Sequence, residues 1–502
     1  MGNLFIGWAE ESIVPSKKVK LFGQFYDRIS EFVESPITVT AMAAKTLDDE
    51  MILVSADLCD VPHFLLNMVR EEFKKLNSEV DPMKIMVAAT HTHTSHTLID
   101  PNAECDEKEV GLETRNILME FTKGNMEYQP LVAANNDYLD PKEASIFVAK
   151  QIAKAANRAW ENRAESFYAN EFGRAAVGMC RRITYDDGTA EMWGDTNSAN
   201  FESLEGGSDS GIELIYTFDK NKKLTGVIAN IACPAQILEQ RSFISADFWG
   251  RAKANIREAL GEDVHLLALG GAGGDQCPRD LVRWVEPETP IDDPQVKRPY
   301  PLRRKADPSM YDISGCNRVG KRISNEILSV LEEVNEYKDE IILEHKVSMI
   351  DLPLRKATKT EYNNAVREIE YFVEKNKEKG HFTFEDTAKA YVHAGLICRY
   401  RYQQFTETFT AETHVIRFGD VAFATNPFEL FLDFGNRLKA RSHAEQIFIV
   451  QLCCGCDGYL PTEKAEKAGH YSAYITSGNV GHEGGDLLVR KQLKEINEMF
   501  DK

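Results

Sequence analysis

Strand-like and helix-like segments alternate along this chain, and the alternation restricts its possible folds more than any other feature of the sequence. Residues 36–56 are rich in Val, Thr and Ile and predict two strands joined by a turn at 48–49. Residues 62–77 place apolar side chains at helical spacing, and the short apolar run 84–90 predicts a buried strand. A strand–helix–strand unit of this kind favours an α/β fold built in layers.

The same alternation continues to the end of the 502 residues, without an internal repeat or a clean linker. It therefore predicts one domain over 1–502, in which several mixed sheets are flanked by helices. We expect further strands at 212–218, 224–232, 264–269, 414–425 and 446–453, and further helices at 143–161, 246–260, 316–337 and 484–501.

Three segments are predicted to be additions to this domain. Residues 98–142 and 278–310 contain several prolines, and proline prevents a regular helix or a central strand. Both are expected to be loop insertions, and loops of this length are either active-site walls or surface excursions. Residues 355–410 contain two charged helical stretches and are expected to form a helical elaboration.

The composition excludes several classes of protein. With 59 Lys and Arg against 79 Asp and Glu, the net charge of −20 argues against nucleic-acid partners and against attraction to anionic membranes. The sequence contains no apolar run long enough to span a bilayer, so we expect no stable membrane anchor. The N-terminus does not read as a secretion signal, and ten cysteines are too few for a disulfide scaffold. We expect a cytoplasmic protein with free thiols.

The most specific local pattern is THTHTSH at 90–96, directly after the strand predicted at 84–90. Side chains alternate between the two faces of an extended chain, so His91 and His93 point the same way. Two imidazoles on one face can serve one metal ion or one oxyanion. The alternative is a polar loop in which the histidines have no common role.

Two further patterns place a cysteine after a predicted strand. In GGAGGDQCPRD at 270–280, glycines allow the backbone to approach a ligand closely, and Cys277 is a nucleophile, a supporting donor or a buried thiol. In NIACPAQILE at 230–239, Cys233 is either a soft zinc ligand or a core cysteine.

The last candidates are two residues near the C-terminus and an arginine pair. Glu429 follows the strand VAFAT, where it is a candidate for the site or an acid in the first turn of a helix, and Tyr459 lies on a glycine-rich turn. The nearby cysteines at 453, 454 and 456 do not have metal-cluster spacing. Arg181 and Arg182 either bind an anionic or carbonyl oxygen or lie at the surface.

Taken in order, these segments resemble the neutral/alkaline non-lysosomal ceramidase family, which are zinc amidases that hydrolyse the N-acyl bond of ceramide. The resemblance runs from FIGWAEESIVP near residue 5 to the end of the chain and is specific at the motifs. It rests on THTHTSHT, IACPAQ, SADFWG, GDQCPR, FELFLDFGNRLK and DGYLPTEKA. It implies an α/β ceramidase-like catalytic domain, here without the C-terminal immunoglobulin-like domain and the secretion signal of that family.

The resemblance also implies a site. Two positions depart from the family pattern, because Cys233 replaces a histidine ligand and Cys277 replaces a serine. A thiolate binds Zn²⁺ well, so the first change is chemically tolerable. The resemblance implies Zn²⁺ held by His91, Cys233, Glu429 and Tyr459, catalytic roles for His93, Cys277, Asp247 and Arg181, and substrate contacts from Arg182 and Tyr471.

We therefore expect a zinc hydrolase that cleaves an amide bond of ceramide or of a related N-acyl compound, with a small or lipid-like substrate as its partner. Two alternatives remain. One is a zinc enzyme of another reaction type that acts on a polar metabolite such as a carbohydrate derivative. The other is a non-catalytic relative that binds a ligand in the same pocket.

Overall fold

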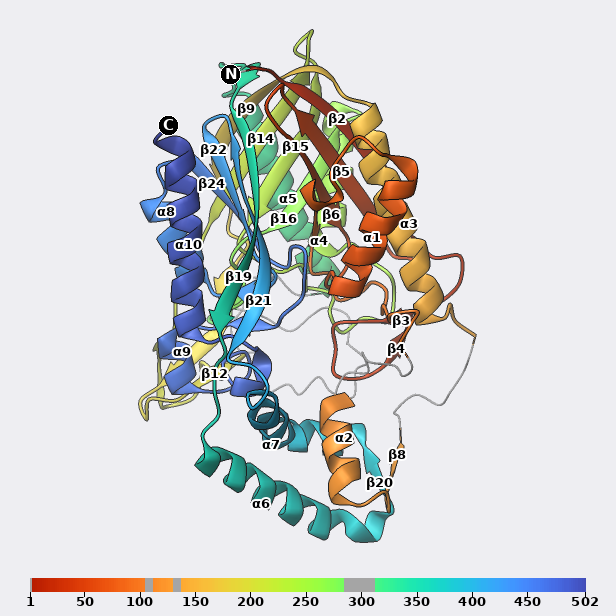
Figure 1. Ribbon diagram of the computed structural model, residues 1–502, viewed down its shortest axis with the longest axis vertical. Helices are drawn as coiled ribbons and strands as arrows, with labels where there is room; N and C mark the ends of the chain where they lie inside the picture. Colours follow the sequence, from red (N-terminus) through yellow and green to blue (C-terminus); the bar gives the residue numbers. More distant parts are fainter. Residues whose placement is uncertain (1, 104–111, 130–136, 284–311) are drawn as a thin grey trace.

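The computed structural model describes residues 2–103, 112–129, 137–283 and 312–502. Its largest element is an eight-stranded sheet in the order β16-β15-β14-β9-β2-β5-β6-β7 (Figure 1). Pairing is antiparallel except between β15 and β16 and between β6 and β7. The bounds are β2 Phe5–Ser12, β5 Thr38–Lys45, β6 Glu50–Ala56, β7 Ile85–Ala89, β9 Ala164–Arg174, β14 Gly211–Asp219, β15 Leu224–Ile231 and β16 His265–Gly270.

The two halves of this sheet pack against each other, so that β16 lies against β6. At this contact Ser55 Oγ donates to the carbonyl of Ala268 at 2.6 Å. Side chains of a strand alternate between two faces. Accordingly, alternate residues of β14, β15 and β16 join two different cores, one shared with β5 and β6 and one shared with α4 and α5. The first core contains Ile215, Ile228 and Leu267, and the second contains Leu214, Val227 and Leu266.

Helices cover the outer face of each half. On one side α1 and α3 pack on β2, β5 and β6, and on the other side α4 and α5 pack on β9 and β16. A sheet whose strands carry apolar side chains on both faces needs a packed layer over each face, and the helices supply it here. The bounds are α1 His63–Leu76, α3 Pro141–Glu161, α4 Asp247–Leu260 and α5 Asp312–Leu331.

A second sheet has the order β19-β21-β22-β24, and α8 and α10 pack beside it (Figure 1). Strands β22 and β24 are parallel, whereas the other pairs are antiparallel. The segment predicted as one strand at 414–425 is a hairpin of β21 and β22. The bounds are β19 Leu343–Pro353, β21 Thr408–Phe418, β22 Val421–Thr425, β24 Gln446–Val450, α8 Leu432–Arg441 and α10 His482–Phe500.

A helical group lies at one end of the molecule (Figure 1), where α6 (Lys359–Asn376), α7 (Phe384–Tyr402) and α2 (Leu112–Phe121) share a small core. Capping boxes at Thr358 and Thr383 begin the first two helices. Helix α2 and the short strand β8 (Glu127–Gln129) fall within 98–142, where the prolines led us to expect loop. The prolines of that segment flank α2 and do not interrupt it.

Most of the second proline-rich segment, 278–310, lies outside the described residues. Among the residues that are described, no helix is long and apolar enough to cross a membrane.

Three parallel strand pairs, β6–β7, β15–β16 and β22–β24, bring their carboxyl ends together. The chain leaving β7 leads to residue 91, and the chain leaving β16 leads to the glycine-rich segment 270–277. The chains leaving β22 and β24 lead to residues 429 and 459. Backbone bonds join these ends, from Ala89 N to Leu452 O at 3.2 Å and from Gln451 N to Gly270 O at 3.1 Å. Loops at the carboxyl ends of parallel strands are a common place for ligand sites.

Candidate active site

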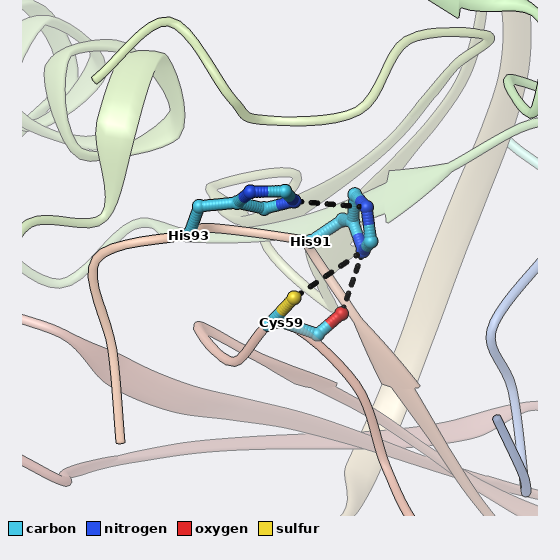
Figure 2. Close-up of side chains that lie close together, drawn as sticks. All are labelled: Cys59, His91 and His93. Atoms are coloured by element: carbon cyan, nitrogen blue, oxygen red, sulfur yellow. Dashed lines mark hydrogen bonds between the residues drawn. The ribbon is translucent and has the colours of Figure 1, made fainter. Parts of the chain in front are cut away.

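His91 is held in one tautomer by its surroundings. Its backbone adopts φ 67°, in the left-handed region, and its Nδ1 lies 2.7 Å from the carbonyl oxygen of Cys59 (Figure 2). A carbonyl oxygen only accepts, so Nδ1 carries a proton, and in the tautomer that this bond selects Nε2 presents a lone pair. Metal-ligating histidines are commonly oriented by such a bond from the second ring nitrogen.

His93 faces His91, with 3.1 Å between the two Nε2 atoms (Figure 2). Burial, together with the nearby His91 and the charges of Arg28 and Arg181, lowers the pKa of His93 well below its usual range. His93 is therefore neutral, and its Nε2–H donates to the lone pair of His91. The backbone carbonyl of His93 accepts from Arg28 Nη2 at 2.6 Å, which holds the loop.

Gly23 supports this arrangement from the opposite side. Its φ of +104° suits glycine alone, and a Cβ at this position would lie 2.5 Å from Cγ of His93. The imidazole of His93 thus packs directly against a backbone position that has no room for a side chain.

Glu429 and Tyr459 are neighbours across a short parallel pair, β23 (Glu429–Leu430) and β25 (Tyr459–Leu460). Glu429 Oε2 lies 3.6 Å from His91 Nε2. Burial raises the pKa of the Tyr459 phenol well above its usual range, and the neighbouring Glu429 adds to the effect. The ring of Tyr471 lies beside that of Tyr459, with 5.5 Å between the centroids.

Arg181 is the cation of this group and is almost completely buried. Its Nη2 donates to the carbonyl of Gly274 at 2.9 Å and to the Tyr459 hydroxyl at 3.3 Å, and lies 3.8 Å from Glu429 Oε2. Its Nη1 donates to Gln236 Oε1 at 3.2 Å. Of the two candidate arginines, Arg181 is the one that faces the histidines and Glu429.

Arg182 has a different environment. Its guanidinium binds Glu205 in a bidentate pair at 2.6 and 3.0 Å and donates to the carbonyls of Gly469 and Tyr471 at 2.8 and 3.0 Å. These bonds hold the segment that carries Tyr471, so the structure gives Arg182 a positioning role and places it away from His91.

Asp247 also forms hydrogen bonds with the backbone. It begins α4 at φ 51°, and its two carboxylate oxygens accept from the amides of Leu238 and Phe248 at 2.8 and 2.7 Å. Burial raises the pKa of this carboxyl to about 6. The bonds of Asp247 tie the loop after β15 to α4, and this loop carries residues that reach the site.

Three residues of the site were not predicted from the sequence. Gln236 Nε2 donates to Glu239 Oε2 at 3.2 Å, and Arg279 Nη2 donates to Glu239 Oε1 at 3.1 Å. The carboxylate of Glu239 lies 3.7 Å from Nδ1 of His93. The only signal in the sequence is that these residues follow β15 and β16, whose parallel pairing brings their ends together.

The two cysteines predicted at the site are both completely buried. Cys233 lies in a hydrophobic cluster with Val177 and Phe248, and its Sγ donates to the carbonyl of Pro234 at 3.5 Å. Among the described residues, it belongs to neither group of His, Cys, Asp and Glu that is compact enough to hold a metal ion. Its sulfur therefore lies outside the compact group formed by Cys59, His91 and His93.

Cys277 lies on β17 (Gln276–Cys277), and its Sγ donates to the carbonyl of Arg279 at 3.3 Å. Burial raises the pKa of its thiol to about 12. At neutral pH it is a thiol and not a thiolate nucleophile.

A third cysteine, Cys59, takes a place beside the histidines that the sequence analysis did not foresee. Its Sγ lies 3.8 Å from Nδ1 of His91 (Figure 2). The ligand atoms of Cys59, His91 and His93 all lie within 4.8 Å of one another. Cys59 follows β6, the parallel neighbour of β7, which explains why it meets His91.

The donor set fits a metal ion of the zinc type. Bonds of about 2.0–2.2 Å in a tetrahedral site separate the ligand atoms by about 3.3–3.6 Å. The two proposed ligand atoms His91 Nε2 and Glu429 Oε2 are 3.6 Å apart, which falls within this range. Imidazole nitrogen, carboxylate and phenol oxygen are ligands that such a metal accepts.

The sequence matches no protein-family model and no curated protein. Solved structures do match. The chain is similar to the neutral ceramidase from Pseudomonas aeruginosa, with a TM-score of 0.68 and 13% identity over 100% of this chain and 75% of that chain. It is also similar to a ceramidase complexed with C2, with a TM-score of 0.67 and 12% identity over 100% of this chain and 76% of that chain.

These comparisons define the class of protein by its fold. The chain has the mixed α/β fold of neutral ceramidase over its whole length, with several sheets flanked by helices. The fold class predicted from the sequence, and the family resemblance at the level of fold, are confirmed.

Proposed function

We propose that this chain is a metal-dependent hydrolase that cleaves an amide bond of an N-acyl compound. The observation that carries the proposal is the meeting of His91, His93, Glu429, Tyr459 and Arg181 at the carboxyl ends of parallel strands, in a ceramidase fold. These residues come from four separate segments of the chain. Together they supply metal ligands, a neutral imidazole and a fixed cation, which are the parts of a metal-assisted hydrolytic site.

We propose Zn²⁺ as the metal, held by His91, Glu429 and Tyr459. Zinc supplies Lewis acidity, which activates water near neutral pH. Cys233 is a fourth ligand suggested by the resemblance, and its thiol would have to leave its apolar surroundings to reach the other three. His91 presents its Nε2 lone pair because the carbonyl of Cys59 holds the proton on Nδ1.

In the reaction, water adds to the carbonyl carbon of the substrate and negative charge develops on the carbonyl oxygen. The guanidinium of Arg181, fixed by Gly274 and Gln236, supplies positive charge to this oxygen. His93 is neutral and keeps a proton on Nε2, which it can donate to the same oxygen. The guanidinium of Arg181 needs little rearrangement, because buried hydrogen bonds already hold it.

Two other predicted residues act through their neighbours. The thiol of Cys277 binds the carbonyl of Arg279, whose guanidinium reaches Glu239 beside His93. Asp247 holds the loop that carries Gln236 and Glu239. We propose that both are positioning residues.

The surroundings of His93 favour a polar substrate as a second candidate. Arg28, Gln236, Glu239 and Arg279 lie around this imidazole. Such a lining suits the polar part of an N-acyl compound, for example a carbohydrate derivative, more than a pair of long alkyl chains. We therefore propose a compact polar N-acyl compound as the second candidate substrate, beside ceramide.

The test combines metal analysis with two assays. We expect the protein, purified without added metal, to contain about one Zn²⁺ per chain, as a site with protein ligands retains its ion. A fluorogenic ceramide and a set of short N-acyl sugars and N-acyl amino acids then identify the substrate class. Zinc with turnover of either set supports the proposal. A chain that binds no metal and releases no acyl group from either set contradicts it and favours the non-catalytic alternative.

A further inference from the structure

A second cluster of reactive side chains lies apart from the candidate active site. We define the Cys454 cluster as Arg70 of α1, Glu412 and His414 of β21, and the neighbours Cys453 and Cys454 after β24. All five residues are buried. The ligand atoms of Glu412, His414 and Cys454 lie within 4.8 Å of one another, and the two sulfur atoms are 3.9 Å apart.

The hydrogen bonds show that His414 carries two protons. His345 Nδ1 lies 3.3 Å from the carbonyl of Glu50, which only accepts, so His345 Nε2 presents a lone pair to His414 Nδ1 at 2.9 Å. On its other side, His414 Nε2 lies 2.9 Å from the carboxylate of Glu412. Both ring nitrogens of His414 therefore donate, and the ring is an imidazolium.

The charges of the cluster then require a second anion. Arg70, through two bonds of 3.0 and 2.5 Å, and His414 share the single carboxylate of Glu412, so these three groups together keep one positive charge. Nearby charges are paired elsewhere: Lys84 with Asp49 at 2.9 Å and His63 with Asp457 at 3.0 Å. A net positive charge in the interior is costly, and the thiolate of Cys454 is the group placed to balance it.

The side chain of Cys453 supports this assignment. Its thiol points at the sulfur of Cys454, which suits an S–H donor next to a thiolate acceptor. Burial by itself raises the pKa of the Cys454 thiol, but the hydrogen bond from Cys453 and the charge of His414 outweigh it, so that the pKa lies below its usual range.

The backbone holds the two cysteines in place. Cys453 N donates to Asn426 O at 3.0 Å and Cys454 N donates to Val87 O at 2.9 Å. Cys454 has φ 60°, in the left-handed region that side chains other than glycine seldom adopt. Unusual backbone of this kind is concentrated at functional sites.

We propose that Cys453 and Cys454 form a peroxide-sensitive dithiol, in which Cys454 is the nucleophile and Cys453 the resolving thiol. The thiolate of Cys454 attacks one oxygen of hydrogen peroxide and the O–O bond breaks. The other oxygen leaves as water with the proton of His414, and Cys454 becomes a sulfenic acid. The sulfur of Cys453 then attacks that of Cys454, the S–O bond breaks, and a second water leaves with the thiol proton. Two electrons pass from the sulfurs to the peroxide.

The product is a disulfide between adjacent residues. Its formation brings the sulfurs from 3.9 Å to about 2.05 Å. A disulfide between neighbouring residues closes a strained ring, and strained disulfides are readily reduced again. Reversibility is therefore expected.

The experiment uses the full-length protein, reduced and then exposed to hydrogen peroxide. After unfolding in the presence of N-ethylmaleimide, mass spectrometry measures the peptide that contains Cys453, Cys454 and Cys456. We expect loss of two hydrogens and of two maleimide adducts, both restored by dithiothreitol. The variant C456S keeps the disulfide and serves as the matched control, since it removes the cysteine nearest to the pair.

Two further variants test the roles of the two sulfurs. In C453S, dimedone should trap a sulfenic acid at Cys454. In H414Q, peroxide oxidation should slow by about tenfold or more, because the thiolate loses its counter-ion. Circular dichroism confirms that each variant is folded.

Three results would overturn the proposal. The first is a pair that peroxide leaves reduced in the folded wild-type protein. The second is a disulfide that includes Cys456 in place of Cys453. The third is a stoichiometric metal ion that C454S removes and H91A does not, which would make this cluster a metal site.

Discussion

At the residue scale, the candidate site depends on side chains whose freedom is removed by their neighbours. The carbonyl of Cys59 fixes the tautomer of His91, and the missing side chain of Gly23 makes room for His93. Arg181 is held by a carbonyl, an amide and a phenol. Each of these groups is fixed before a substrate arrives. We therefore expect that substitution of a metal ligand removes both metal and turnover, whereas substitution of Arg181 lowers turnover alone.

The first prediction concerns His91. The substitution His91→Ala removes the Nε2 lone pair and is expected to abolish both zinc content and turnover. Metal analysis and an N-acyl hydrolysis assay measure the two effects. His443→Ala, an exposed histidine paired with Asp501, is the control and should keep both. A His91→Ala variant with a full complement of zinc would show that His91 is not a ligand.

The second prediction concerns Arg181. Arg181→Met is expected to keep zinc and to lower kcat by about 10²–10³-fold, because a fixed donor to the developing oxyanion is lost. The comparison is Arg182→Met, which breaks the bidentate pair with Glu205 and should mainly lower the melting temperature. Equal loss of kcat and equal loss of stability in the two variants would contradict the distinction between these arginines.

At the element scale, the site is assembled where three parallel strand pairs end, and short contacts keep the following loops in place. The loop after β15 is tied to α4 by Asp247, and the glycine-rich segment after β16 is tied to β24 by Gln451, whose Oε1 accepts from Gly273 N at 3.0 Å. Changes in these contacts should move side chains that lie several residues away.

The third prediction concerns Asp247. Asp247→Ala leaves the buried amides of Leu238 and Phe248 without their acceptors, at a cost of about 1–3 kcal/mol for each unsatisfied group. We expect a lower free energy of unfolding in urea and reduced kcat with zinc retained, since Gln236 and Glu239 lose their support. Unchanged stability would mean that the loop is held in another way.

At the scale of the whole molecule, the two sheets are joined by a buried ion pair. Arg70 of α1, which packs on the large sheet, reaches Glu412 of β21 in the second sheet. Removing one partner of such a pair leaves the other charge unpaired in the interior and costs about 3–5 kcal/mol. Glu412 thus links the two layers as well as belonging to the Cys454 cluster.

The fourth prediction is the pH dependence of this link. Burial raises the pKa of Glu412, but the bonds from His414 and Arg70 lower it to about 2 overall, below its ordinary value of 4.5. The stabilisation is therefore complete above pH 4.5 and is lost as the pH falls toward 2. Urea unfolding at pH 5 and pH 3 should show a steeper loss of stability in the wild type than in Glu412→Gln. Parallel losses would contradict the assignment.

The sequence by itself determined the order of most helices and strands, because periodicity and turn residues act over a few neighbouring positions. It also indicated that His91 and His93 lie together, although the extended segment expected there is in fact a loop in which His91 has φ 67°. The helix α2 was not foreseen, because the prolines of 98–142 gave the whole segment the character of a loop although they lie outside the helix.

Only the tertiary structure decided which side chains meet across distant segments. It separated Arg181 from Arg182, placed Cys59 beside His91, left Cys233 in an apolar cluster, and brought His414 to Cys454. These contacts join residues on different strands, loops and helices, and they follow from sheet order and register. A local pattern of residue types contains no information on such pairings, because burial and charge balance depend on the whole packed molecule.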